Sequence, residues 1–256
     1  MSTMPDTTVL SLSTLPVELV YRIFDHLDDW SMICLAQSIC VRLNIILNSY
    51  HRYQTLTSLD ISCKEIDGFG VQRLAIALRK NETLTTLNLS NNRIDKQGAK
   101  HIADALLQNK TLTTLSLIFT YISAEEVQYF ANSLLQNETL SILVLSMNKI
   151  QNRGAQYLAS ALRQNKTLTT LDLNNNSIGD PGAYHFANTL QENQTLITLN
   201  IGWNRVGFQG IERFVNVLQQ NKLFTKMDLR FNGMDYRQEQ HIQNLLKNYP
   251  EINIIV

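Results

Sequence analysis

The sequence contains little cysteine: Cys34, Cys40 and Cys63 are the only three among 256 residues. An odd and sparse set cannot form the disulfide framework that stabilises many small secreted domains. Cys34 and Cys40 also lack the C-x-x-C spacing that is common in zinc and redox sites, so they are more typical of core thiols. We therefore expect a protein of a reducing compartment.

Charge and long apolar runs are also scarce. Lysine plus arginine balance aspartate plus glutamate at 22 each, and charged residues make up only 17% of the chain. Such a chain lacks the long-range field that attracts nucleic acid or an anionic membrane. It has no run of eighteen apolar residues for a membrane-spanning helix, and its first ten residues lack the features of a signal peptide. These absences predict a cytoplasmic or nuclear protein that binds neither nucleic acid nor membrane.

One repeated pattern dominates the rest of the chain. The pattern L-x-x-L-x-L-x-x-N-x-I is present at residues 84–94, and the same frame recurs every 28 residues along the chain. The seven repeats begin at Leu56, Leu84, Leu112, Leu140, Leu168, Leu196 and Phe224. Self-similarity at a fixed period of this length predicts a stacked solenoid rather than a globule.

Each repeat has two halves with different apolar periods. Alternation centred on Leu87 in the first half predicts a short, half-buried strand. In the second half, Ala155, Leu158, Ala159 and Leu162 follow the i, i+3, i+4, i+7 spacing of one helix face. Strands stack about 4.8 Å apart whereas helices need roughly 10 Å, so we expect a curved sheet with the strands on the concave side.

The repeats resemble leucine-rich repeats of the ribonuclease-inhibitor type. The resemblance implies an α/β fold, a right-handed solenoid with a curved parallel β-sheet inside and helices outside. It covers residues 56–256, as seven repeats and a final edge strand at residues 252–256. Glu239 and Gln243 replace apolar residues of the last helix, which is typical of a terminal capping repeat.

The N-terminal part of the chain has no such repeat. Residues 1–11 are small and polar, and we predict that they are disordered. Pro16 opens a first helix, because proline is favoured at the first helical position. Two more helices are expected near residues 30–37 and 41–48.

Residues 12–50 resemble an F-box. The matching positions are Leu15, Pro16, Glu18, Leu19, Ile23, Phe24, Leu27, Asp28, Leu35, Ser38, Cys40 and Leu43. The third helix departs from the family pattern, because Val41 and Arg42 follow Cys40 where many F-boxes have a basic residue and a tryptophan.

The F-box resemblance implies a three-helix bundle that binds the Skp adaptor of a cullin-RING ubiquitin ligase. The implied adaptor-binding residues are Leu15, Pro16, Leu19, Ile23, Phe24 and Leu27. The alternative is that the bundle only caps the apolar end of the solenoid.

Two series of asparagines recur with the repeat. The first follows the strands, and we expect its buried amides to bond the backbone of neighbouring turns, with Lys64 and Thr120 as exceptions. Its members are Asn92, Asn148, Asn176, Asn204 and Asn232. The second stands where the helices end, in Asn-x-Thr, which is a glycosylation acceptor in secreted proteins. We expect its members to adopt the left-handed conformation that ends a helix. They are Asn81, Asn109, Asn137, Asn165 and Asn193.

No catalytic or metal-binding pattern is present in the sequence. The five histidines are scattered without metal-ligand spacing, and the glycines follow the repeat rather than a phosphate-binding loop. We predict that the chain is not an enzyme and uses no metal or cofactor.

The concave face is the expected site for a protein target. Most side chains at the second and fourth positions after the first leucine are small and polar, but the fourth repeat has Ile142 and Val144. Exposed apolar and aromatic residues beside basic ones are typical of interfaces. The predicted target-binding residues are Ile118, Phe119, Tyr121, Ile142, Val144, Met147, Trp203, Lys226, Arg230 and Phe231. The alternative is that Phe119 and Trp203 fold over the strand ends and cover the core.

Together the two resemblances imply a substrate receptor of a Skp-cullin-F-box ubiquitin ligase, which presents a bound protein for ubiquitin transfer. A second hypothesis is a binding or inhibitory scaffold with no link to a ligase, as the ribonuclease-inhibitor resemblance implies. A third is a GTPase regulator, since Ran GTPase-activating proteins have similar repeats. The third is least favoured, because the sequence has no long acidic tail of the kind that family carries.

Overall fold

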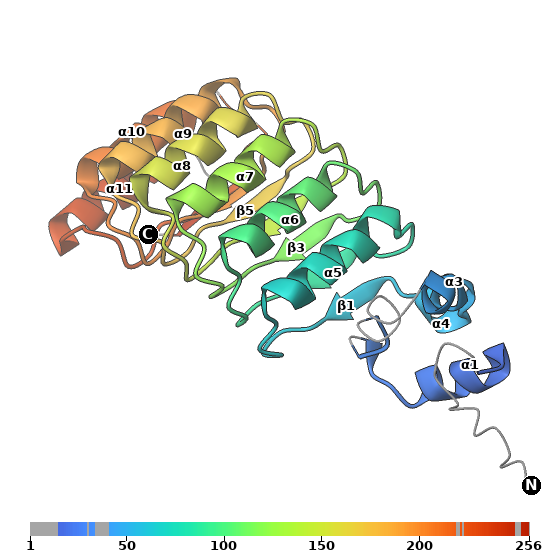
Figure 1. The fold of residues 1–256 in the computed structure, drawn as a ribbon. Coiled ribbons are helices and arrows are strands. Elements are labelled where there is room, and N and C mark those ends of the chain that lie inside the picture. The colour runs from blue at the N-terminus through green and yellow to red at the C-terminus, as the bar shows by residue number, and fades with distance from the viewer. Residues whose placement is uncertain are drawn as a thin grey trace, which may run out of the picture. The chain divides into compact units, whose positions relative to one another are not determined.

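The computed structural model describes residues 15–29, 31–33, 41–218, 221, 223–248 and 252–255. The chain divides into two compact units, with the boundary between Leu56 and Thr57. Figure 1 shows the helices of the first unit and the alternating strands and helices of the second.

The first unit is helical where it is described. Its helices are α1 (Val17–Asp25), α3 (Val41–Ser49) and α4 (His51–Gln54). Residues 1–11, most of the helix predicted at 30–37, and Cys34 and Cys40 lie outside the described residues.

Aromatic packing joins α1 to the segment between α3 and α4. Val20 and Phe24 form the buried face of α1, and the Phe24 ring meets the edge of the Tyr50 ring at a centroid distance of 5.4 Å. The Tyr50 hydroxyl donates a hydrogen bond of 2.5 Å to Asp25. Burial raises the pKa of Tyr50, and the bond to the Asp25 carboxylate raises it further. Tyr50 is therefore held protonated as a donor to α1.

In its described residues, the second unit contains one parallel sheet, whose eight strands lie side by side in sequence order. Neighbouring strands pair in register at the repeat period, so that Leu59, Leu87 and Leu115 stand side by side. The strands are β1 (Ser58–Asp60), β2 (Thr86–Asn88), β3 (Thr114–Ser116), β4 (Ile142–Val144), β5 (Thr170–Asp172), β6 (Thr198–Asn200), β7 (Lys226–Asp228) and β8 (Asn253–Ile255). The predicted α/β architecture and its repeat register are confirmed.

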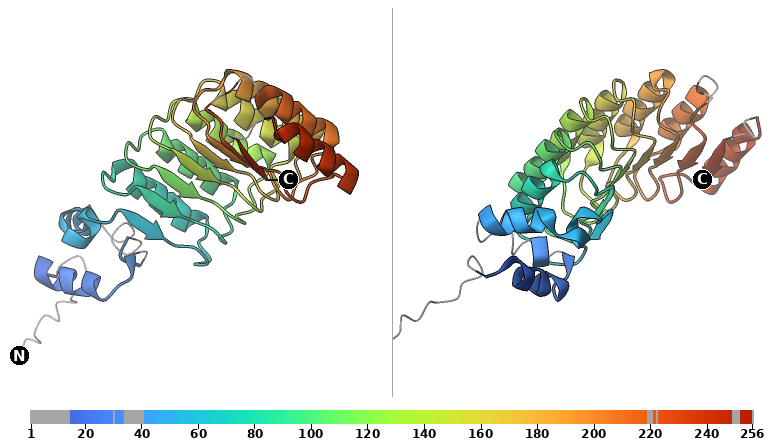
Figure 2. Two further views of the ribbon diagram at one scale, coloured as in Figure 1. Left: turned by 180° about the vertical axis from the view of Figure 1, so that it is seen from behind. Right: turned by 90° about the vertical axis from the view of Figure 1, so that its right-hand side faces the viewer.

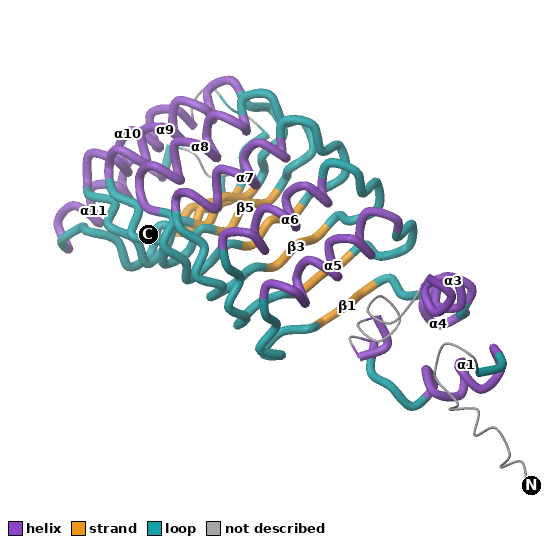
Figure 3. The backbone as a smooth tube through the Cα atoms, in the orientation of Figure 1, coloured by secondary structure: helices purple, strands orange, loops and turns teal. Residues whose placement is uncertain are grey.

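A helix follows each of the first seven strands. These helices are α5 (Gly68–Lys80), α6 (Lys96–Leu106), α7 (Ala124–Leu134), α8 (Gln151–Leu162), α9 (Asp180–Glu192), α10 (Phe208–Leu218) and α11 (Tyr236–Leu246). They lie along one side of the sheet, as Figures 2 and 3 show. The predicted helix face of Ala155, Leu158, Ala159 and Leu162 is buried. The core therefore lies between this helical layer and the sheet, and the opposite face of the sheet is open.

The asparagines that follow the strands form the predicted ladder. Asn148 is typical: its amide donates to the Leu117 and Leu145 carbonyls at 2.7 and 3.0 Å. Its carbonyl oxygen accepts from the backbone N–H of Thr120 and Ile122 at 3.1 and 3.0 Å. One side chain thus bonds backbone groups of its own repeat and of the repeat before it.

The ladder continues through the exceptional third repeat. The Thr120 hydroxyl donates to the Leu117 carbonyl at 2.9 Å, and Thr120 is completely buried. A hydroxyl has one donor where an amide has two, and the Asn148 amide also reaches Leu117. The Leu117 carbonyl of the third repeat therefore keeps its hydrogen bonds although threonine replaces asparagine at position 120.

The second asparagine series corrects a sequence-based prediction. These residues do not adopt the left-handed conformation; Asn81 and Asn193, which end α5 and α9, are extended with φ of −77° and −73°. Asn109 instead is buried, donates to the Leu78 carbonyl at 2.8 Å, and accepts from the Thr111 and Leu112 N–H groups. The series is a second ladder that also includes Asn221.

The last repeat has the predicted polar character. Ile242 is the only buried residue of α11, whereas α8 buries a full apolar face. The final strand β8 pairs with β7 through Met227 and Ile254. Its residues are exposed or half-buried.

We expect Asn148→Ala to lower the free energy of unfolding by about 3 kcal/mol, because each buried backbone group left without a partner costs roughly 1–3 kcal/mol. The matched control is Asn175→Gly, at an exposed position with φ of 52° that glycine adopts without strain. Urea unfolding followed by circular dichroism measures both. Equal stability of the two variants would contradict the stabilising role assigned to the ladder.

Candidate functional site

The residue before each ladder position lies just beyond the C-terminal end of its strand. In sequence it precedes the asparagine, or its replacement Lys64 or Thr120. All seven residues at this repeat position have left-handed backbone, with φ between 52° and 59°. We call them the edge row: Cys63, Asn91, Phe119, Met147, Asn175, Trp203 and Phe231. Backbone bonds such as Phe119 N–H to the Ser146 carbonyl, 3.0 Å, join the first six members to the next repeat.

Several edge-row residues are of types that left-handed backbone does not favour. Asparagine tolerates the left-handed conformation, and Asn91 and Asn175 fit it. A bulky side chain in this conformation costs roughly 1–2 kcal/mol, and four members are Phe, Met, Trp and Phe. Phe119, Met147, Trp203 and Phe231 are 42, 47, 56 and 61% exposed, so core packing does not repay that cost. The alternative that Phe119 and Trp203 cover the core is therefore disfavoured.

The three aromatic members of the edge row take part in two ring pairs. The Trp203 and Phe231 rings stack at a centroid distance of 4.2 Å with 29° between their planes. Phe119 meets Tyr121 at 5.2 Å, and Tyr121 is also left-handed and half exposed. Met147 and Asn175 belong to the two repeats that separate the pairs. Stacking fixes the rings before a partner arrives, which lowers the entropy lost on binding.

The open face of the sheet carries a small apolar patch next to the edge row. Ile142 and Val144 are half-buried on β4, and Ile118 is half-buried just after β3. In register with Ile142 stand Thr114 and Thr170, so polar residues flank the patch. Six of the predicted target-binding residues lie in the third and fourth repeats, in the patch, in the edge row or, for Tyr121, beside Phe119. These are Ile118, Phe119, Tyr121, Ile142, Val144 and Met147.

The remaining predicted target-binding residues belong to the last two full repeats. Arg230 follows β7 and pairs with Asp228, with 2.6 Å between Nη2 and Oδ2. Burial opposes ionisation of Asp228, but the hydrogen bonds and charge of Arg230 prevail and hold the pKa of Asp228 below its usual value. Lys226 is exposed on β7. The charge of Arg230 is thus balanced within the chain, and its part in a surface beside Phe231 would be mainly apolar contact.

Five of the six predicted adaptor-binding residues reach the surface of the first unit. Pro16 is exposed, Leu19 is 42% exposed, and Leu15, Ile23 and Leu27 are half-buried. Phe24 differs: it is completely buried against Tyr50. Phe24 is therefore a core residue of the first unit, and its predicted contact with an adaptor stays a prediction.

The described part of the chain offers no metal site. Within it, no group of three or more His, Cys, Asp and Glu side chains is arranged to hold an ion. None of the described helices has the length and apolar character that a bilayer crossing requires.

Sequence reasoning finds individual aromatics but misses the row they share. It does not select Cys63, Asn91 and Asn175, because these residues lack the large apolar or basic side chains that are typical of an interface. An alignment of the seven repeats on their first leucine places all edge-row residues in one column. The left-handed backbone that makes the large residues unusual is visible only in the structure.

We expect Arg230→Gln to raise the pKa of Asp228, since the burial that favours the protonated acid remains while the cation is lost. In the wild type the depressed pKa adds stability above the ordinary value of 3.8, and this is lost as pH falls through the folded-state pKa. The variant should therefore lose less stability on acidification. Carbon-13 NMR titration measures the Asp228 pKa in the wild type and the variant, with Asp60 as the internal control because Ser62 holds its pKa down. An unchanged Asp228 pKa would refute the coupling.

Comparisons with known proteins agree with this architecture. The sequence matches a family model described as Leucine Rich repeat at residues 80–103, 136–159, 164–187 and 192–215. These segments do not test residues 12–50. No curated protein matches the sequence.

Two solved structures are similar to part of this chain. The tropomodulin C-terminal domain of Caenorhabditis elegans gives a TM-score of 0.50 at 18% identity, covering 59% of this chain and 92% of that one. The structure of Leiomodin-1 Actin-Binding Site 2 (ABS2) gives 0.48 at 20% identity, covering 59% and 87%. At these identities the likeness concerns the fold alone. Repeat period, sheet register and matched segments together show that the chain carries leucine-rich repeats, an architecture suited to binding other proteins.

Proposed function

We propose that the chain is a non-catalytic protein-binding protein whose second unit takes a protein partner on the edge row and the adjoining apolar patch. The observation that carries the proposal is the presence of exposed Phe, Met and Trp side chains on strained, left-handed backbone. Strain of this kind persists where function maintains it. Aromatic residues in a rigid row are typical anchors of protein interfaces.

The chemistry of the surface favours a protein over other partners. The chain has no net charge, so a nucleic acid would gain little electrostatic attraction. The preformed Trp203–Phe231 stack and the patch around Ile142 and Val144 present apolar contacts with polar neighbours. Interfaces between proteins have this mixture of aromatic core and polar rim.

The role proposed for the first unit is to dock a Skp adaptor, which would make the chain a substrate receptor of a cullin-RING ligase. The support is the resemblance of residues 12–50 to an F-box and the exposure of Pro16, just before α1, and of Leu19 on α1. Val20 and Phe24 hold the other side of α1 in the core. Under this proposal the chain supplies orientation and effective concentration for ubiquitin transfer, while other subunits supply catalysis.

The edge row is tested with the variant Met147→Asn/Trp203→Asn/Phe231→Asn. Asparagine suits left-handed backbone, so the variant should fold with a melting temperature near that of the wild type. Ile76→Gln/Leu135→Gln is the control, because both side chains are exposed apolar residues outside the edge row. Partners captured by the wild type are purified and their affinity is measured by titration calorimetry.

We expect a direct complex with the wild type and the control, and at least a tenfold loss of affinity in the edge-row variant. Equal affinity of the two variants would refute the edge row as the binding surface. Failure of every captured protein to bind the purified chain would refute the proposed function itself.

The adaptor proposal is tested by pull-down of purified Skp adaptor with the wild type, Leu19→Asp and Arg22→Ala. Leu19→Asp leaves the buried side of α1 intact, and Arg22 is an exposed control on the same helix. Capture by the wild type and Arg22→Ala, with loss in Leu19→Asp, supports a ligase receptor. No capture by the folded wild type would leave a binding scaffold with no link to a ligase.

A further inference from the structure

A hollow of about 680 Å³ opens beside the edge row in the first three repeats. Two aromatic side chains, Phe119 and Tyr121, line one part of it. Three acidic side chains, Glu65, Asp67 and Asp95, line another. The hollow thus combines partly exposed aromatic rings with carboxylates, and both kinds of group attract a cation.

The aromatic wall is held in place by the backbone. Phe119 and Tyr121 have φ of 53° and 65°, and their rings lie 5.2 Å apart. Glu65 and Asn91, which also line the hollow, are left-handed as well. The walls therefore come from consecutive turns whose backbone is fixed by the repeat, so the hollow exists before a ligand binds.

The two aspartates each use one oxygen to start a helix and leave the other available. Oδ1 of Asp67 accepts from the Gly70 N–H at 2.8 Å, and Oδ1 of Asp95 accepts from the Gly98 N–H at 2.7 Å. Within the described residues, neither Oδ2 accepts a hydrogen bond. A Cβ at Gly68 would lie 2.9 Å from Oδ2 of Asp95, so glycine is the residue that admits this carboxylate.

Helix capping does not by itself require these negative charges. The start of α7 is capped by the neutral hydroxyl of Ser123, in a reciprocal pair with Glu126. Serine and asparagine cap helices about as well as aspartate does. Capping alone therefore does not explain why both positions have a charged residue.

The charge of the hollow remains negative after its cations are counted. Arg93 lines it and has no ion-pair partner in the described part of the chain. Each of the two helix N-termini adds about half a positive charge. Set against three carboxylates, these leave about one negative charge. The neighbouring cation Lys96 is already paired with Glu125 at 2.9 Å.

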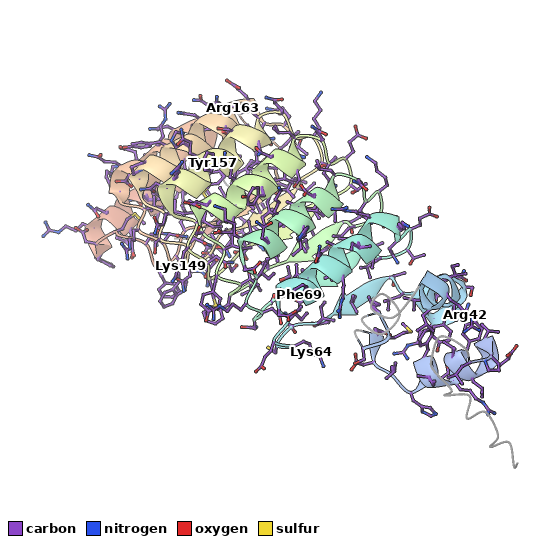
Figure 4. All side chains as sticks on the ribbon, viewed as in Figure 1. Arg42, Lys64, Phe69, Lys149, Tyr157 and Arg163 are labelled. Atoms are coloured by element: carbon purple, nitrogen blue, oxygen red, sulfur yellow. The ribbon has the colours of Figure 1, made fainter. Side chains whose placement is uncertain are left out.

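A second hollow, of about 500 Å³, continues from the first. The two share Asp67, Gly68 and Asp95, and the second adds the Phe69 ring and the His101 side chain. Phe69 projects from the start of α5, as Figure 4 shows, and is 72% exposed. The shared carboxylates therefore lie between an aromatic pair on one side and a single aromatic ring on the other.

We propose that the two hollows form one groove that binds a basic peptide segment of the protein partner. An arginine or lysine side chain lies against Phe119 and Tyr121 and pairs with Glu65 and the free oxygens of Asp67 and Asp95. This inference deepens the proposed function and rests on it, because it names the chemistry that the partner brings to the first three repeats.

The probe for this groove is the tripeptide acetyl-Gly-Arg-Gly-amide, with acetyl-Gly-Glu-Gly-amide as its charge-reversed counterpart. Each is titrated into the isotope-labelled full chain, and amide shifts of Gly68, Asn91 and Gly98 are followed by NMR. We expect saturating shifts of these amides with the arginine peptide and none with the glutamate peptide. Equal responses to both peptides, or no response to either, would overturn the proposal.

Variants separate the groove from general surface charge. In Glu65→Gln/Asp67→Asn/Asp95→Asn the asparagines keep the helix caps, and we expect at least a tenfold rise in the Kd of the arginine peptide. Asp235→Asn is the matched control, since Asp235 caps α11 in the same way. A triple variant that binds as tightly as this control would also overturn the proposal.

The outcomes for the groove and for the edge row are distinguishable because the two variants substitute different residues, although Asn91 and Phe119 belong to both surfaces. If the peptide fails to bind while partner affinity depends on Met147, Trp203 and Phe231, only the groove is refuted. If the peptide binds but no partner depends on those three residues, the groove stands and the edge row is refuted.

Discussion

The structure of the second unit depends on side-chain amides that bond the backbone between its strands and helices. A parallel strand of three residues bonds few of the backbone groups in its repeat, and buried groups without partners are costly. Asn148 bonds two carbonyls and two N–H groups at one end of its strand. Asn137 has the same role at the other end, donating to Leu106 and accepting from Thr139 and Leu140. Side-chain amides therefore hold neighbouring repeats together at both ends of their strands.

These bonds leave the edge row free to vary. Because Asn148 and its equivalents fix the turn, the residue before each of them can have a side chain that the backbone does not favour. The stability of the ladder offsets the strain at Phe119 or Trp203. The edge row is thus a set of positions with fixed geometry and variable chemistry, and this is how a repeat protein can acquire a specific partner on a constant frame.

The two ends of the edge row differ in how their charges are used. Around Phe231, Arg230 is neutralised by Asp228 within the chain, so apolar contact dominates. Around Phe119, the carboxylates of Asp67 and Asp95 keep one oxygen free after capping α5 and α6. A partner that lies along the row would meet an aromatic stack toward one end and the proposed groove for a basic side chain toward the other. Such asymmetry would fix the direction in which the partner binds.

The sequence by itself determined the solenoid, because its period of 28 residues places equivalent residues side by side and its apolar spacing sets which faces are buried. It also determined the ladder after the strands, because a polar residue that recurs among buried leucines must find its hydrogen-bond partners in the backbone. Only the tertiary structure decided the role of Asn109 and its equivalents, the burial of Phe24 and the conformation of the edge row. Each of these depends on contacts with residues distant in sequence, such as Leu78 for Asn109 and Tyr50 for Phe24. The groove joins three repeats, and a pattern read within one repeat carries no information about a surface that neighbouring repeats make together.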